Sequence, residues 1–169
     1  MKKQSAGLLV YRLRDGKPEV LIAHMGGPWF AKKDKGSWSI PKGEYENGQD
    51  PKQVARREFK EELGQVAPDG KLIELGTVEQ KNNKTVVAWA TEANLDTSEV
   101  KSNVFKTEWP PKSGKMQEFP EIDRAEYFSL SEAAKKLIPE QVPLLKRLAQ
   151  HLKVPFSSSG ETPSQGSLF

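Results

Sequence analysis

The chain has 169 residues, of which 36% are hydrophobic and 29% charged, so it is long enough to form one domain with a substantial core. Its formal net charge of +3 lacks the strong basic bias of a protein that binds duplex nucleic acid. The sequence has no cysteine, which excludes disulfides, thiolate metal ligands and a cysteine nucleophile.

Two apolar segments near the N-terminus predict a β-hairpin. Residues 6–13 and 19–25 read as strands, and residues 14–18, Arg-Asp-Gly-Lys-Pro, supply the turn between them. The first apolar run is too short for a signal peptide or a membrane span. We therefore expect a cytoplasmic protein that does not associate with membranes.

Residues 26–42 predict a loop that is rich in positive charge and aromatic surface. They hold three glycines, two prolines, two tryptophans and four lysines, a composition that suits a phosphorylated ligand with a ring. By residue type, Trp29, Phe30 and the distant Trp109 are candidates for stacking on a base. The alternative is that Trp38 and Ile40 pack the loop onto the core while most of the lysines are solvated.

The stretch from residue 50 to residue 64 predicts a helix with both ends marked. Asp50 supplies a side-chain acceptor at the N-cap, Pro51 stands at the first helical position, and Gly64 is placed to end the helix. At about 100° per residue, an apolar stripe forms on one side. Its members are Ala55, Phe59 and Leu63.

Three carboxylates form a second stripe beside the apolar one: Glu58, Glu61 and Glu62. Like charges at the i, i+4 spacing, and anions in the last two turns, each cost from a few tenths to about 1 kcal/mol. A bound hard cation is the simplest compensation, because clustered carboxylate oxygens are ligands for Mg²⁺ and Mn²⁺. An ordinary solvated acidic face is the alternative interpretation.

The rest of the chain predicts further strands followed by helices. Its expected elements are strands at 72–79 and 84–92, an edge strand at 102–109 with a surface loop at 110–114, a strand at 125–129, and helices at 131–137 and 140–152. Together they indicate an α/β fold with a mixed sheet covered on both faces. The polar tail, 153–169, is expected to be disordered.

The helix and the residues before it resemble the Nudix hydrolase signature, G-x5-E-x7-R-E-U-x-E-E-x-G-U. The match runs from Gly43 through Arg57 and the three glutamates to Gly64. Gln49 replaces a signature Glu, and Gln65 replaces an aliphatic residue. The resemblance covers residues 1–152, and it implies an α/β/α sandwich with a mixed central sheet that hydrolyses nucleoside diphosphates linked to another group.

The resemblance also implies roles for the motif residues. Glu58 and Glu62 would be metal ligands, Glu61 a ligand or the general base, and Arg57 would orient a catalytic carboxylate. The backbone carbonyl of Lys42 would be a further ligand for Mg²⁺ or Mn²⁺. Because Gln49 has lost the charge of the family's Glu, we expect Arg57 to be freer to pair with Glu61.

Family members often take one more carboxylate from the loop before a late strand, and this implies Glu121, with Glu118 as the alternative. The run from Trp38 to Gly43 resembles the W-x-x-P-K-G segment of Nudix enzymes that act on dinucleoside polyphosphates and diphosphoinositol polyphosphates. Trp38 and the side chain of Lys42 are therefore expected to bind substrate.

The leading hypothesis is an enzyme that hydrolyses phosphoanhydride bonds of a small nucleotide substrate with the help of a divalent metal ion. The alternative from another class is a Nudix-fold module that binds a nucleotide without turning it over. The complete set of three carboxylates favours the enzyme, since a binding module has no need of them.

Overall fold

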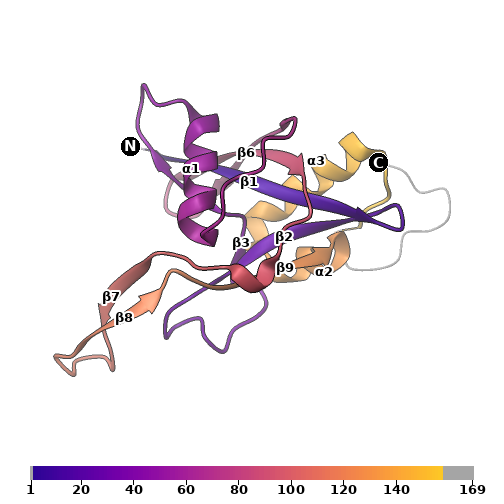
Figure 1. Ribbon diagram of the computed structural model, residues 1–169. Coiled ribbons are helices and arrows are strands. Elements are labelled where there is room, and N and C mark those ends of the chain that lie inside the picture. Colours follow the sequence, from indigo (N-terminus) through magenta and orange to yellow (C-terminus); the bar gives the residue numbers. More distant parts are fainter. Residues whose placement is uncertain (1, 158–169) are drawn as a thin grey trace.

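The structure is a computed structural model that describes residues 2–157, and it consists of a mixed sheet with helices on both faces (Figure 1). The expected α/β/α sandwich is confirmed. In chain order the elements are β1 (Lys3–Arg14), β2 (Lys17–Met25), β3 (Trp38–Ser39), β4 (Lys42–Tyr45), α1 (Pro51–Leu63), β5 (Ile73–Gln80), β6 (Lys84–Glu92), the 3₁₀ helix η1 (Thr97–Glu99), β7 (Val104–Glu108), β8 (Met116–Pro120), β9 (Ile122–Ser129), α2 (Leu130–Lys136), the 3₁₀ helix η2 (Pro139–Gln141) and α3 (Val142–Leu152).

The main sheet has the strand order β3-β2-β1-β6-β5, with β4 also pairing with β1 and β9 with β2. β1 and β2 form the expected hairpin, but their strands are longer and the turn is shorter than predicted. Asp15 and Gly16, both with positive φ, make a two-residue turn that matches the twist of the strands. β1 runs parallel to β6, while the other pairs of the sheet are antiparallel.

Side chains alternate along β1 between two hydrophobic cores. Leu9 and Tyr11 join the core on the side of α2 and α3, whereas Leu8 and Val10 join the core under α1. This period of two follows from the pleat of a strand buried on both faces. The sheet therefore fixes α1 on one side, with its apolar stripe against β1.

β7 and β8 form a separate two-stranded hairpin that projects from the body of the molecule (Figure 1). The strand expected at 102–109 is present as β7, and it pairs with β8 and not with the main sheet. One face of the hairpin carries Phe105 and Phe119, whose rings lie 6.1 Å apart. An isolated hairpin of this kind is marginally stable, so its packing on the body matters.

The ordered domain extends beyond the end expected at residue 152. Val154 packs against the core beside α3, and Phe156 is buried there, so residues 153–157 do not belong to a disordered tail. The remaining tail, residues 158–169, lies outside the described residues. Within residues 2–157, no helix has the length and apolar character needed to cross a membrane.

Candidate active site

Helix α1 begins and ends where its sequence predicts. The Asp50 side chain accepts a hydrogen bond of 3.0 Å from the Lys52 amide, and Gly64 ends the helix in the left-handed region at φ 73°. A side chain at Gly64 would also meet the carbonyl of Lys101 at 2.5 Å. Because the apolar stripe is buried against β1, the three glutamates emerge at the boundary between core and solvent.

Glu62 joins the last turn of α1 to β4. Its carboxylate accepts a hydrogen bond of 3.0 Å from the backbone N–H of Lys42. Burial raises the pKa of Glu62 to about 7, the bond and charge of Lys42 oppose this rise, and the carboxylates of Glu121 and Glu58 add to it. Charged groups from α1, from β4 and from the junction of β8 and β9 therefore act on the Glu62 carboxylate together.

Glu58 lies directly over the backbone of Gly43. An added Cβ at Gly43 would collide with the Glu58 carboxyl group, so only glycine allows this approach. Burial raises the pKa of Glu58, and the Glu61 carboxylate raises it further, whereas a weak contact of 3.4 Å with Arg57 lowers it. The signature glycine therefore makes room for a signature glutamate.

This contact predicts the effect of Gly43→Ala. The backbone can accept alanine because φ is not positive, and the crowding falls on a flexible side chain, so we expect the fold to persist. The displaced Glu58 carboxylate should lower kcat about 10- to 100-fold, since small misplacements of reacting groups are costly. Steady-state kinetics and a thermal melt measure both. Gly70→Ala, which crowds the Thr91 hydroxyl instead, is the control, and wild-type kcat in Gly43→Ala would contradict the interpretation.

Glu121 stands at the junction of β8 and β9 and faces the helix carboxylates. Burial raises the pKa of Glu121 and the charge of Glu61 raises it further. Glu118 lies instead on the projecting hairpin, where its carboxylate is 3.8 Å from the Lys106 ammonium. Of the two alternatives, the structure brings Glu121 to the cluster and leaves Glu118 outside it.

A short segment that sequence patterns do not single out connects these parts. The amides of Lys101 and Asn103 donate to the carbonyls of Leu63 and Glu61, at 3.0 and 3.2 Å, and so satisfy the end of α1. The carbonyl of Asn103 then accepts from the Glu121 amide at 2.9 Å. Segment 101–103 therefore links the helix that carries Glu61 to the strand junction that carries Glu121.

Gly26 completes this link from the side of β2. Its amide donates to the Glu121 carbonyl at 2.8 Å, and an added Cβ would collide with the carbonyl of Pro120. The Ser102 hydroxyl accepts from the Ile122 amide at 2.9 Å and holds the same junction. Backbone bonds between distant segments leave no local pattern in the sequence. Among the residues that form this link, only Gly26, the glycine that follows the second strand, stands out in the sequence.

Lys42 is positioned by β4, where it pairs with Gly7 of β1. Burial lowers the pKa of its ammonium group, and the charge of Glu62 is the largest influence in the opposite direction. Its backbone N–H is committed to Glu62, so the residue contacts the cluster through its main chain. The charges of Glu62 and Glu58 both act on its ammonium group. The side chain therefore lies near the carboxylates, as a contact with substrate phosphates would require.

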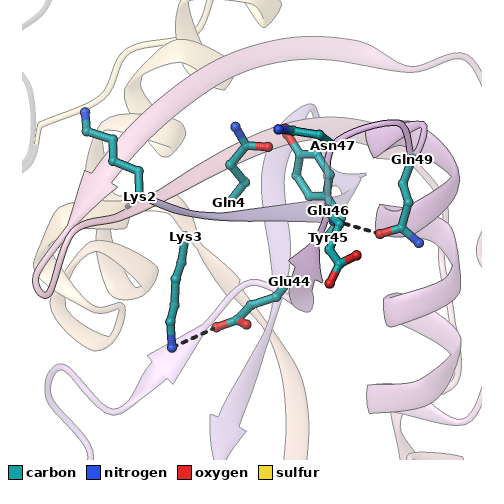
Figure 2. Close-up of a pocket in the computed structure, with 8 residues that line it drawn as sticks. All are labelled: Lys2, Lys3, Gln4, Glu44, Tyr45, Glu46, Asn47 and Gln49. Carbon is teal, nitrogen blue, oxygen red and sulfur yellow. Dashed lines mark hydrogen bonds and ion pairs between the residues drawn. The ribbon is translucent and has the colours of Figure 1, made fainter.

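Arg57 and Gln49 do not form the contacts expected from the signature. Arg57 is half exposed and lies 3.4 Å from Glu58, so the expected pairing with Glu61 is wrong. Gln49 instead closes the turn before α1, where its side-chain oxygen accepts a 2.8 Å bond from the Glu46 amide (Figure 2). Gln49 lies before α1, whose first residue, Pro51, is about 9 Å from Arg57 along the helix axis, and its side-chain oxygen is already bonded to Glu46.

An open hollow of about 960 Å³ lies beside Gln49, lined by residues from the start of β1, from β4 and from the turn after β4. Figure 2 draws these residues. The hollow lies at the N-terminal end of α1, whereas the three glutamates occupy the last two turns. None of the three glutamates lines it, and α1 rises about 10 to 17 Å from its first residue, Pro51, to Glu58 and Glu62. This hollow is therefore distinct from the carboxylate cluster.

Trp38 does not reach the cluster. Its side chain is 1% exposed in the core on the side of α2 and α3, and its indole N–H donates to Asp34 at 2.8 Å. The expectation that Trp38 binds substrate is corrected by this burial, since no face of the indole remains open. The interpretation in which Trp38 and Ile40 pack the loop onto the core is the one that the structure supports.

The carboxylates match a hard divalent cation in chemistry. All the side-chain donors are oxygens. Burial, and then repulsion from neighbouring carboxylates, raises the pKa values of Glu58, Glu62 and Glu121, and a bound cation would oppose both effects. Within residues 2–157, however, no three acidic or histidine side chains stand as a ready-made metal site. The oxygen donors suit such an ion, and the carboxylates would move closer together when it binds.

Comparison with known proteins shows the family and the fold. The model of the NUDIX domain matches residues 1–148. A C. elegans Ap4A hydrolase in a binary complex is 24% identical, with a TM-score of 0.61 over 89% of this chain and 97% of that one. The Nudix domain of Shewanella oneidensis NrtR, complexed with ADP ribose, is 12% identical, with a TM-score of 0.59 over 90% and 89%. A search for relatives among curated proteins found no match.

The fold and the carboxylate helix define a Nudix domain, and the structural likenesses, all under 25% identity, concern the fold. Because the family model covers most of the chain, the protein belongs to the Nudix family. With the three motif glutamates present, it is a Nudix-type pyrophosphohydrolase.

Proposed function

We propose that the protein hydrolyses a phosphoanhydride bond in a nucleoside polyphosphate or a dinucleoside polyphosphate, with Mg²⁺ as its cofactor and Mn²⁺ as a substitute. The observation that carries this proposal is the meeting of Glu58, Glu61, Glu62 and Glu121 in one electrostatic environment. Repulsion among these carboxylates, of which Glu58 and Glu62 are half-buried, is unfavourable in the absence of a cation. The cluster is thus suited to a polyanionic substrate that arrives with metal.

Glu58, Glu62, Glu121 and the backbone carbonyl of Lys42 would hold the ion, and Glu61 would be a ligand or the base. A bound divalent cation supplies charge neutralisation on the phosphates and lowers the pKa of water. The more exposed Glu61 can take a proton from the attacking water, while Arg57, at 3.4 Å from Glu58, restrains that carboxylate. The Lys42 ammonium would contact a phosphate oxygen.

Support for a nucleotide substrate comes from two directions. The C. elegans neighbour is an Ap4A hydrolase and the Shewanella neighbour was crystallised with ADP ribose, so this fold accommodates both kinds of ligand. In this chain, the segment before the motif supplies Lys42 at the edge of the cluster, where a phosphate chain would pass. These observations favour a substrate with several phosphates.

The test is phosphate release from a panel of nucleoside triphosphates, Ap4A, ADP-ribose and a diphosphoinositol polyphosphate, each with Mg²⁺, Mn²⁺ or EDTA. We expect metal-dependent turnover of at least one nucleotide and none in EDTA. Turnover unaffected by EDTA would refute the metal role. Hydrolysis restricted to the diphosphoinositol compound would refute the nucleotide assignment.

A further inference from the structure

Two tryptophans from distant parts of the chain meet at the surface beside the projecting hairpin. The ring centroids of Trp29 and Trp109 are 5.8 Å apart with an interplanar angle of 78°, an edge-to-face contact. Trp29 is nevertheless 48% exposed, and Trp109 is only half buried. The open indole surface can contact a ligand that presents a flat apolar face.

Both indoles are held by ordered backbone. The Trp109 amide donates to the Lys115 carbonyl at 3.0 Å, and its own carbonyl accepts from the Gln117 side chain at 2.7 Å. On the other side, Phe105 of β7 lies against Gly27, where an added Cβ would meet the ring at 2.7 Å. The hairpin thus docks on the 26–30 segment through an aromatic-on-glycine contact and carries Trp109 to Trp29.

The rest of the 26–37 loop is fixed as well. The buried His24 lies between the Asp123 carboxylate and the Lys33 carbonyl, at 2.7 and 2.6 Å from its two ring nitrogens. The Ser37 hydroxyl donates to the same carbonyl at 3.0 Å. A loop held in this way presents Trp29 without a large ordering cost on ligand binding.

The loop that carries Trp29 starts at the strand junction that carries Glu121. Gly26 bonds to the backbone of Glu121, and Trp29 follows Gly26 by three residues, so the α-carbons of Gly26 and Trp29 are at most about 11 Å apart. The two loops that carry the pair also carry exposed lysines, which give them positive charge. These are Lys32, Lys33, Lys35, Lys112 and Lys115.

We propose that Trp29 and Trp109 form a stacking site for the nucleobase of the substrate whose phosphates lie at the carboxylate cluster, an inference that rests on the proposed function. The ring would stack on the open indole surface of Trp29, and Trp109 would brace that indole from its side. The lysines would favour the anionic chain that leads from the base to the cluster. Specificity for ring-bearing substrates then resides in the contact between the hairpin and the loop.

The test compares two ligands that differ by an adenosine group, ADP and pyrophosphate, in calorimetric titrations with Mg²⁺. Loss of one stacking contact in Trp29→Ala should raise the Kd for ADP roughly 5- to 150-fold. The Kd for pyrophosphate should stay within about twofold, because the phosphate groups keep their contacts. Trp29→Phe should retain much of the ADP affinity, and Trp109→Ala should weaken ADP binding less than Trp29→Ala does.

Leu13→Ala is the matched control, since Leu13 is 49% exposed at the far end of β1. Circular dichroism confirms folding of each variant. The stacking site is overturned if Trp29→Ala leaves both Kd values unchanged, if it weakens the binding of both ligands equally, or if the wild type does not prefer ADP to pyrophosphate.

ADP binding through Trp29 without hydrolysis of any nucleotide would contradict the proposed function alone. Hydrolysis of a nucleotide with unchanged KM in Trp29→Ala would sink the stacking site alone.

Discussion

Replacing Glu58 or Glu61 by glutamine should remove most of the turnover and leave the fold intact. A metal ligand or general base contributes about 10² to 10⁴ in rate, so kcat should fall by that factor in each variant. Stability of the metal-free protein should not fall, because each change removes a charge that repels its neighbours, and burial already disfavours the ionised form of Glu58. Steady-state kinetics at saturating Mg²⁺ and thermal melts in EDTA measure the two effects.

The two variants also separate the roles of the two residues. Loss of a ligand should weaken Mn²⁺ binding in a titration, whereas loss of a base should leave Mn²⁺ affinity near that of the wild type and lower kcat alone. Glu132→Gln, on α2 at the opposite face of the sheet, is the control for removal of one exposed carboxylate. Wild-type kcat in both Glu58→Gln and Glu61→Gln would show that the helix carboxylates are not the catalytic centre.

The metal-free protein should lose stability as the pH rises from about 4.5 to about 7. Burial raises the pKa of Glu62 from 4.5 to about 7 in the folded state, so the folded protein binds a proton that the unfolded chain releases in this window. The contribution of Glu62 to stability is fully present below pH 4.5, the pKa of this group in the unfolded chain. It is lost as the pH rises through about 7, the pKa in the folded protein. A shift of this size corresponds to about 3 kcal/mol in the free energy of unfolding.

Urea unfolding in EDTA at pH 5 and pH 8 measures this difference. In Glu62→Gln the drop between the two pH values should shrink by most of that amount, because glutamine carries no proton to lose and can still accept the bond from Lys42. Glu74→Gln, on the exposed side of β5, should keep the wild-type drop. Adding Mg²⁺ at pH 8 should restore stability to the wild type. A drop of equal size in Glu62→Gln and wild type would assign the pH dependence to other groups.

The local features of the site could be predicted from sequence because short-range geometry decides them. Helix α1, its caps at Asp50 and Gly64, and the stripe of glutamates beside the apolar stripe all follow from residues within four positions of one another. The two strands before the motif could also be predicted from local patterns. The resemblance to the Nudix signature, which is a short stretch of sequence, then implied the fold class. Packing of α1 against β1 then required only that the apolar stripe be buried.

What the tertiary structure alone decided are the contacts between segments far apart in the chain. The choice of Glu121 over Glu118 depends on backbone bonds to Gly26 and Asn103, which carry no side-chain signature. Burial of Trp38 and exposure of Trp29 have the same origin, because nearby residues of one type can end on opposite sides of a loop. The sequence by itself determined which carboxylates α1 carries beside its apolar stripe, since helix periodicity is local. Their placement against β4 and beside Glu121 was decided by strand pairing and loop docking, whose energy comes from partners that no short stretch of sequence contains.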